Sequence, residues 1–142
     1  TDITAPTQAL AGKKTSCDRP GCSLHLHAVL AIRNLGHVFA STAPGIMMGV
    51  GSMGDRLRPY GECDTFISTD AGLSWRMVAR GPHKHVFADQ GGLLVMAADA
   101  PSIDVVQYSF DYGTTWTTLA LSEAIEPVVL TSVPDGTARR CV

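Results

Sequence analysis

Residues 68–75 read STDAGLSW, and residues 109–116 read SFDYGTTW. The two octets share Ser, Asp, Gly, a hydroxyl residue and Trp at the same places, and the second copy starts 41 residues after the first. A period of about 40–50 residues is typical of the four-stranded blades of a β-propeller. The repeat therefore predicts blades that each contain one copy of the octet.

The sequence around the octets divides into short β-rich runs separated by Gly, Pro and Asp turns. The runs are 46–50, 64–69, 74–80, 85–88, 93–98, 104–110, 115–121 and 127–133, and apolar alternation predicts a further strand in 23–35. No window from residue 46 onward keeps the apolar spacing of a helix. We predict an all-β chain, a β-propeller fragment of about two to three four-stranded blades.

The aspartate and glycine of each octet suit a tight turn between two strands. The carboxylates of Asp70 and Asp111 can accept backbone N–H bonds across the turn, while Gly72 and Gly113 can adopt a positive φ. The tryptophan of each octet would bury apolar surface between sheets, and its indole N–H needs one acceptor. The alternative is that these aspartates are catalytic. The structural role is favoured because both copies lie in the same local turn context. The residues assigned structural roles are Ser68, Asp70, Gly72, Trp75, Ser109, Asp111, Gly113 and Trp116.

The composition is that of a globular protein without a basic face. The chain has 142 residues, 45% of them hydrophobic and 17% charged, and a formal net charge of −2. Such a balance offers no positive field for nucleic acid, so we exclude DNA and RNA as partners. No apolar stretch approaches the roughly 20 residues that span a bilayer, and membrane contact is expected only through a segment outside this chain.

Four cysteines indicate an oxidising compartment. Cys17 and Cys22 flank a short polar loop that contains Pro and Gly, and we predict that they form a disulfide. Zinc would need two close pairs of ligands, whereas Cys63 and Cys141 have no cysteine nearby in sequence. The pairing of these last two stays open: they can bond to each other or to cysteines outside this chain.

The octet is the Asp-box, a motif of sialidases, other glycosidases and the sortilin family, and its surroundings here are more specific. The chain reads SLHLH at 23–27, GIMMGVGSMGD at 45–55, GPH at 81–83 and DQGGLLV at 89–95. In this order over roughly residues 17–135, these segments and the two boxes resemble the lumenal propeller of the sortilin-type sorting receptors.

The resemblance implies both an architecture and a function. It implies that residues 17–142 are later blades of a ten-bladed propeller, incomplete without the remaining blades, and that residues 1–16 are a linker or blade connection. It also implies a non-enzymatic transmembrane receptor without cofactor or metal, which carries cargo proteins or peptides between Golgi and endosomes or lysosome-like compartments. The fragment would face the lumen of those membranes or the cell exterior. The alternative is an Asp-box glycosidase, sialidase-like, or a carbohydrate-binding propeller.

Two His-X-His pairs, His25 with His27 and His83 with His85, are candidate functional residues. On a strand, each pair would place both imidazoles on one face, a geometry that metal sites use. Because the first pair lies in the family segment and the second adjoins a turn, we expect no metal. We keep the hypothesis that these histidines sense pH between near-neutral and acidic compartments.

A second candidate set has the residue types of a sialidase site. Arg56, Arg58, Tyr60 and Glu62 lie close together in sequence. A glycosidase needs such groups to converge from separate blades, whereas these four lie in one polar turn. We therefore interpret them as a solvated loop and predict no catalytic residue.

Overall fold

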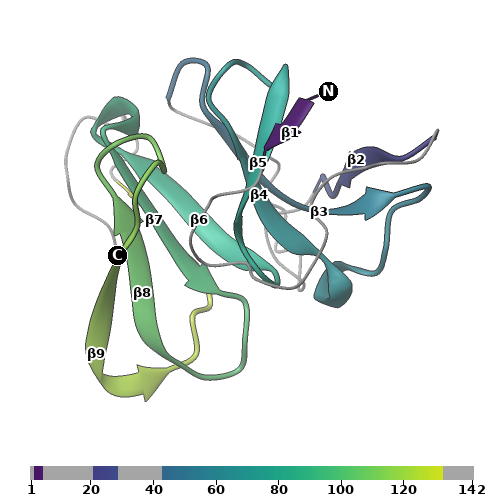
Figure 1. The fold of residues 1–142 in the computed structure, drawn as a ribbon. Helices are drawn as coiled ribbons and strands as arrows, with labels where there is room; N and C mark the ends of the chain where they lie inside the picture. The colour runs from purple at the N-terminus through teal and green to yellow at the C-terminus, as the bar shows by residue number, and fades with distance from the viewer. Residues whose placement is uncertain (1, 5–20, 29–42, 133–142) are drawn as a thin grey trace.

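The computed structural model describes residues 2–4, 21–28 and 43–132, which form two β-sheets packed against each other (Figure 1). Within those residues the only helical segments are two short 3-10 turns, η1 (Tyr60–Glu62) and η2 (Asp89–Gly91). The all-β prediction is confirmed. No helix in the described ranges is long and apolar enough to cross a membrane.

The first sheet contains four antiparallel strands, which we call the first blade. They are β2 (Ser23–Leu26), β3 (Met47–Gly54), β4 (Asp64–Ser68) and β5 (Ser74–Ala79). They hydrogen-bond in sequence order, and the short strand β1 (Asp2–Thr4) adds in parallel to the outer edge of β5. The first Asp-box is the turn that joins the third and fourth strands of this blade.

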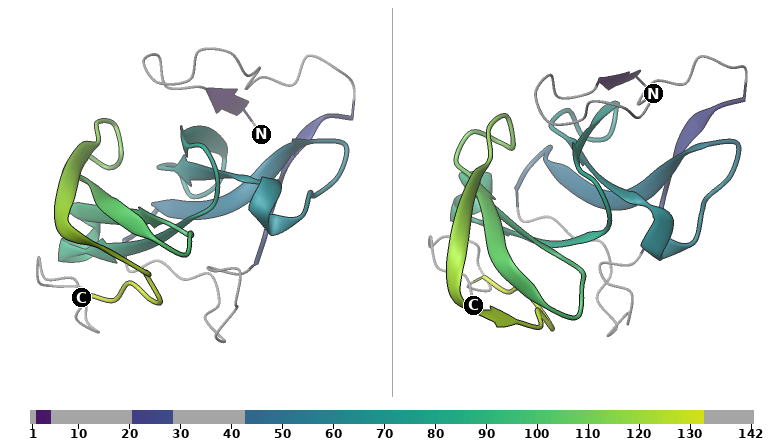
Figure 2. Two further views of the ribbon diagram at one scale, coloured as in Figure 1. Left: turned by 90° about the horizontal axis from the view of Figure 1, so that it is seen from below. Right: turned by 60° about the horizontal axis from the view of Figure 1, so that its bottom comes forward.

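The second sheet, which we call the second blade, repeats the pattern. Its strands are β6 (His83–Ala88), β7 (Leu93–Ala98), β8 (Ile103–Ser109) and β9 (Thr117–Ile125). They form an antiparallel meander in sequence order, and the second Asp-box again joins the third strand to the fourth. Figure 2 shows the two sheets as separate twisted layers. Two blades of this kind confirm the predicted propeller fragment.

Some predicted strand boundaries are wrong at the ends of the chain. The run 127–133 is not a strand, because within its described part only Ser132 forms an isolated bridge. Pro127 lacks a backbone N–H and ends the ladder, while β9 continues to Ile125, beyond the predicted end at 121. The strand predicted over 23–35 ends at Leu26, and residues 29–42 lie outside the described residues.

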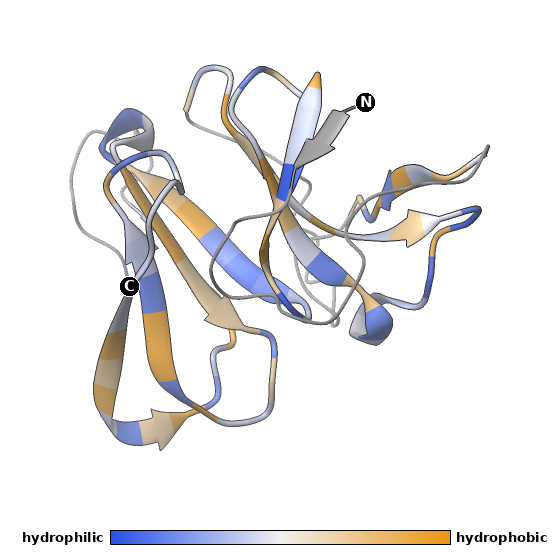
Figure 3. Cartoon of the chain, in the orientation of Figure 1, coloured by the Kyte–Doolittle hydropathy of each residue, from blue (hydrophilic) through white to orange (hydrophobic). Residues whose placement is uncertain are grey.

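The main core lies between the two blades. Met48 and Ile67 of the first blade meet Phe87, Leu94 and Met96 of the second, all at most 4% exposed. Figure 3 shows hydrophobic segments, coloured orange, along strands of both sheets. Burying each of these core side chains contributes about 1.5–3 kcal/mol. The facing sheets are therefore held together mainly by apolar contact.

The first blade also has an apolar cluster on its other face. Phe66, Trp75 and Met77 are buried there, with Leu24, Leu26, Met47 and Met53 packed partly against them. Phe66 and Ile67 are neighbours in β4 but belong to opposite clusters, as the period of two in a strand requires. A sheet that is apolar on both faces is suited to stacking between two neighbours.

Candidate functional site

The first Asp-box turn is closed by a network of hydrogen bonds around Asp70. Its Oδ1 accepts from Ser68 Oγ and from the Ser74 backbone N–H, both at 2.8 Å, and its Oδ2 accepts from the Ser74 hydroxyl. Ser68 Oγ in turn accepts the Gly72 N–H at 2.8 Å. The bonds from Ser74, with a further bond from Ser68, lower the pKa of Asp70 to about 2.

The second Asp-box repeats this network bond for bond. Asp111 accepts from Ser109 Oγ at 2.7 Å and from the backbone N–H and hydroxyl of Thr115 at 2.8 and 2.6 Å. The Gly113 N–H reaches Ser109 Oγ at 2.8 Å. The bonds from Thr115 lower the pKa of Asp111 to about 2. Both carboxylates therefore stay ionised at mildly acidic pH and are directed into their own turns.

The glycine of the second Asp-box is needed for two reasons. Its φ is +75°, which side chains rarely adopt, and the residue before it, Tyr112, is also left-handed at +57°. In addition, a Cβ on Gly113 would lie 2.8 Å from Cδ1 of Ile67 in the first blade. The turn thus packs closely across the junction of the two blades.

The two tryptophans differ in their polar contacts. Trp75 is 6% exposed, and its Nε1 donates to the Gly72 carbonyl at 3.0 Å. Trp116 packs against the cluster between the blades, but its buried Nε1 has no acceptor among the described residues. Within the described residues, the hydrogen-bond acceptor predicted for each indole N–H is therefore seen for Trp75 and not for Trp116.

The structural role of the Asp-box stays a prediction, and Ser68 offers a direct test. Replacing Ser68 with alanine removes the acceptor of the Gly72 N–H and a donor to Asp70 at a side chain only 1% exposed. We expect the free energy of unfolding of the intact protein to fall by about 1–3 kcal/mol. Urea denaturation measures it, with the exposed Ser102→Ala as the matched control. Unchanged stability together with lost ligand binding would contradict the structural role.

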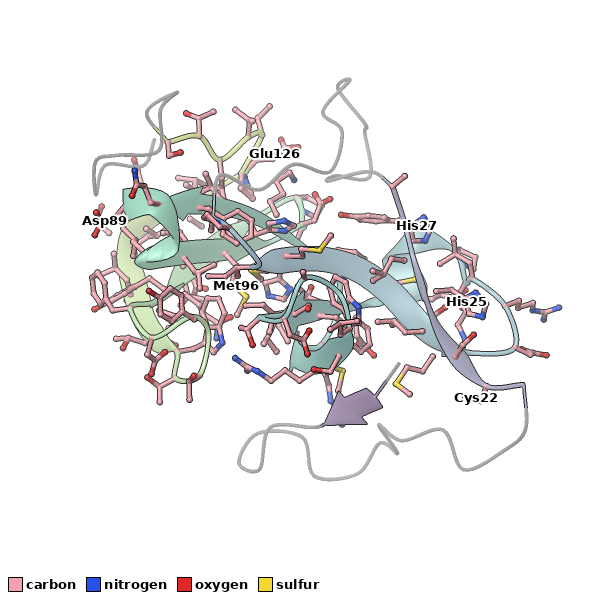
Figure 4. The ribbon with its side chains drawn as sticks, turned by 90° about the horizontal axis from the view of Figure 1, so that it is seen from above. Cys22, His25, His27, Asp89, Met96 and Glu126 are labelled. Carbon is pink, nitrogen blue, oxygen red and sulfur yellow. The ribbon has the colours of Figure 1, made fainter. Side chains whose placement is uncertain are left out.

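The first histidine pair lies along β2 and just after it (Figure 4). Nε2 of His25 is 3.2 Å from the Gly54 carbonyl, and Nε2 of His27 is 2.9 Å from the Arg58 carbonyl. The His27 ring also meets Tyr60 edge-on, with centroids 5.3 Å apart. Both imidazoles thus connect β2 to the far end of β3 and the segment after it.

The second histidine pair lies in β6, on the face turned to the first blade. His83 Nδ1 is 3.1 Å from the Gly81 carbonyl and 3.3 Å from Thr65 Oγ1. His85 is 8% exposed, packs edge-on against Phe87, and leaves Nδ1 without a partner in the described part of the chain. Burial lowers the pKa of His83, and it lowers the pKa of His85 to about 4. The pH-sensing role of the four histidines stays a hypothesis.

The four histidines in the described part of the chain are not gathered into a metal site. Within residues 2–4, 21–28 and 43–132, no group of three or more His, Cys, Asp or Glu side chains is placed to hold a metal ion.

The cysteines fall into two kinds. Cys22 is disulfide-bonded, but its predicted partner Cys17 lies outside the described residues, so that pairing stays a prediction. Cys63 is a free thiol, 1% exposed, that contacts the carbonyls of Arg58 and Pro59 at 3.5 and 3.4 Å. Burial raises the pKa of this thiol. Cys141 lies outside the described residues.

Tyr60 does not belong to a solvated loop. Its side chain is buried with Val50 and Cys63, and burial raises the pKa of its hydroxyl above the ordinary value. Its neighbours Arg58 and Glu62 are exposed, as expected. The solvated-loop interpretation is therefore wrong for Tyr60, which is a core residue and is poorly suited to act as a nucleophile.

Sequence reasoning missed two charged features. Lys84 and Asp99 form an ion pair with side chains only 12% and 5% exposed. Arg76 of β5 reaches across to the second Asp-box, where its Nη2 donates to the Tyr112 carbonyl at 3.2 Å. Lys84 lies between His83 and His85 in one strand. Because side chains alternate along a strand, the sequence could have placed Lys84 on the face opposite to the two histidines. Nothing in the sequence marks the contact of Arg76.

Comparison with known proteins gives a consistent result. The family model described as "Sortilin, neurotensin receptor 3" matches residues 1–130. Vacuolar protein sorting/targeting protein 10 of Laccaria bicolor is 46% identical over 143 residues, covering 99% of this chain and 10% of that protein. The protein of the same name from Mycosarcoma maydis is 46% identical over 94% of this chain and 9% of its own length. The protein of the same name from Aspergillus flavus is 43% identical over 86% of this chain and 8% of its own length. The chain thus spans at most a tenth of these relatives.

Proposed function

Because this chain belongs to the family of sortilin and the Vps10 sorting receptors, we propose that it forms part of the lumenal ligand-binding propeller of a transmembrane sorting receptor. The receptor binds cargo proteins or peptides and carries them between the Golgi and endosomes or lysosome-like compartments. The chain lies on the lumenal side of those membranes or at the cell surface.

The observation that carries this proposal is the extent of the match. An identity of 46% over 99% of the chain includes both blades and both Asp-box turns, and the relatives are named for vacuolar protein sorting and targeting. The fold supports it in a second way, because a blade that is apolar on both faces is suited to stacking within a larger propeller. The remaining blades of that propeller are the structural partners of this chain.

The role we propose for these blades is binding, without catalysis. Asp70 and Asp111 have their carboxylates occupied by hydrogen bonds within their own turns, so neither is poised to exchange a proton with a substrate. Propellers bind ligands through strand edges and pockets between loops, which supply backbone hydrogen bonds and side-chain specificity.

Deleting the gene in its own organism tests the proposal. A receptor that carries soluble hydrolases to the lysosome-like compartment keeps them inside the cell. We therefore expect deletion to divert at least one of them into the medium. Immunoblotting of cell and medium fractions measures the diversion, with a constitutively secreted protein as the control. Normal retention of every soluble hydrolase in the deletion strain would contradict the proposal.

The glycosidase alternative has its own assay on the intact protein. Fluorogenic sialosides and glucosides report turnover directly. Turnover that a single carboxylate substitution abolishes would overturn the receptor proposal, because a sorting receptor has no catalytic carboxylate.

A further inference from the structure

An open pocket of about 500 Å³ lies where the two blades meet near the second Asp-box. From the first blade its walls include Ile46, Thr69 and Arg76, and from the second they include Gln90 of η2 and the Asp-box residues Asp111 and Tyr112. In Figure 1, η2 and the β8–β9 turn both lie at the upper end of the second blade. The pocket therefore exists only because the two blades pack together.

Arg76 is the charged group of this pocket with unused hydrogen-bonding capacity. A guanidinium carries five N–H donors. Nη2 of Arg76 donates to the Tyr112 carbonyl at 3.2 Å, and the other donors have no acceptor among the described residues. Burial lowers the pKa of Arg76, which reflects the partial loss of water around the cation. A ligand whose oxygens accept hydrogen bonds from these N–H groups would replace the bonds to water that burial removes.

The nearby Asp111 leaves that cation available. Its carboxylate takes donors from Ser109 and Thr115 within its own turn, and within the described part of the chain it makes no ion pair with Arg76. Asp111 therefore attracts the Arg76 cation electrostatically, which opposes the effect of burial on its pKa, but the Asp111 oxygens accept their hydrogen bonds from their own turn and leave the remaining guanidinium N–H groups unpaired within the described residues. A planar guanidinium with free N–H groups is the side chain best suited to grip a carboxylate through two parallel bonds.

The other walls fit a short acidic side chain with an apolar stem. The Gln90 side chain has no hydrogen-bond partner within residues 43–132, and its backbone is held left-handed at φ +51° in η2. Ile46 is buried and contributes an apolar wall, and Tyr112 is 52% exposed. The pocket thus combines the Arg76 cation, the Gln90 amide, the Asp111 carboxylate and the hydroxyls of Thr69 and Thr114 with the apolar wall of Ile46.

We propose that this interblade pocket is a recognition site for the carboxylate of a peptide, with Arg76 as its anchor and the Gln90 amide as a second donor. The site lies between the first and second blades at their Asp-box end. The inference rests on the proposed function, because it takes the peptide to be part of a cargo protein.

The test is a titration of the intact protein with N-acetylglutamate, followed by saturation-transfer NMR on the small ligand. N-acetylglutamine, which has the same shape without the charge, is the matched ligand control. We expect N-acetylglutamate to bind and the Arg76→Gln variant to bind it at least about tenfold more weakly, as the loss of a charge-assisted pair predicts. Arg56→Gln, at an exposed arginine after β3, should leave the affinity within about twofold.

Three outcomes would overturn the inference. They are equal binding of the glutamate and glutamine ligands, equal affinity of the parent and Arg76→Gln, and tighter binding of a methyl sialoside than of N-acetylglutamate.

Two further variants, Arg76→Lys and Gln90→Ala, test the site even if Arg76→Gln does not fold. Lysine keeps the charge but not the paired donors, so it should weaken binding less than glutamine does, and loss of the Gln90 amide should weaken it measurably. The hydrolase-retention assay is independent, so failure of this site leaves the proposed receptor function standing.

Discussion

Replacing Leu94 with alanine is expected to destabilise the intact protein by about 2–5 kcal/mol. Leu94 is fully buried in the cluster between the blades, with Met48, Ile67 and Phe87 among its members. The substitution removes apolar packing and leaves a cavity that the two sheets can close only by moving relative to each other. Urea denaturation and the midpoint of thermal unfolding measure the loss.

Leu73→Ala is the matched control, because it makes the same chemical change at a side chain that is 76% exposed. We expect its free energy of unfolding to stay within about 0.5 kcal/mol of the parent. Equal stability of the two variants would show that Leu94 is not packed in a core between the two blades.

Acidification is expected to destabilise the protein through His85. The pKa of His85 is lowered by burial from an ordinary 6.5 to about 4, so the unfolded chain takes up a proton at a pH where the folded protein does not. The contribution of His85 to stability is therefore full above about pH 6.5, falls as the pH drops toward 4, and is constant below that. Between pH 7 and pH 5 the loss from this one group is about 2 kcal/mol.

The variant His85→Phe isolates this contribution. Phenylalanine keeps a ring beside Phe87 and removes both the titrating group and the unpartnered Nδ1. We expect its stability to equal or exceed that of the parent at pH 7, and its loss between pH 7 and pH 5 to be smaller by about 2 kcal/mol. Urea titrations at several pH values measure both. The same pH dependence in parent and variant would refute the assignment.

This pH window also bears on the histidine hypothesis. Because burial lowers the pKa of both His83 and His85, acidification acts on the second pair by weakening the junction of the blades. An imidazole that formed an ion pair on protonation would instead stabilise the protein as the pH falls. If the second pair senses pH, it does so through the stability of the interface.

The sequence alone determined the blade pattern, because the interactions that make an Asp-box are local. Asp70 bonds residues two and four positions away, and Asp111 does the same, so an octet contains nearly all the partners that its turn needs. The period of the octets then specified four strands per repeat. Short β-rich runs between Gly, Pro and Asp turns likewise indicated the strands of the second blade.

Only the tertiary structure decided which residues are covered, since burial depends on segments far apart in the chain. Arg76 and Tyr112 are brought together across 36 positions, and the sequence carries no sign of this contact. Tyr60 reads as part of a polar loop, yet it is buried because its ring fits beside Val50 and Cys63. His85 looks like a candidate sensor by its type alone, and its depressed pKa follows from the sheet that packs over it. Local hydrogen bonds are encoded within a few residues, whereas desolvation is produced only when two sheets meet.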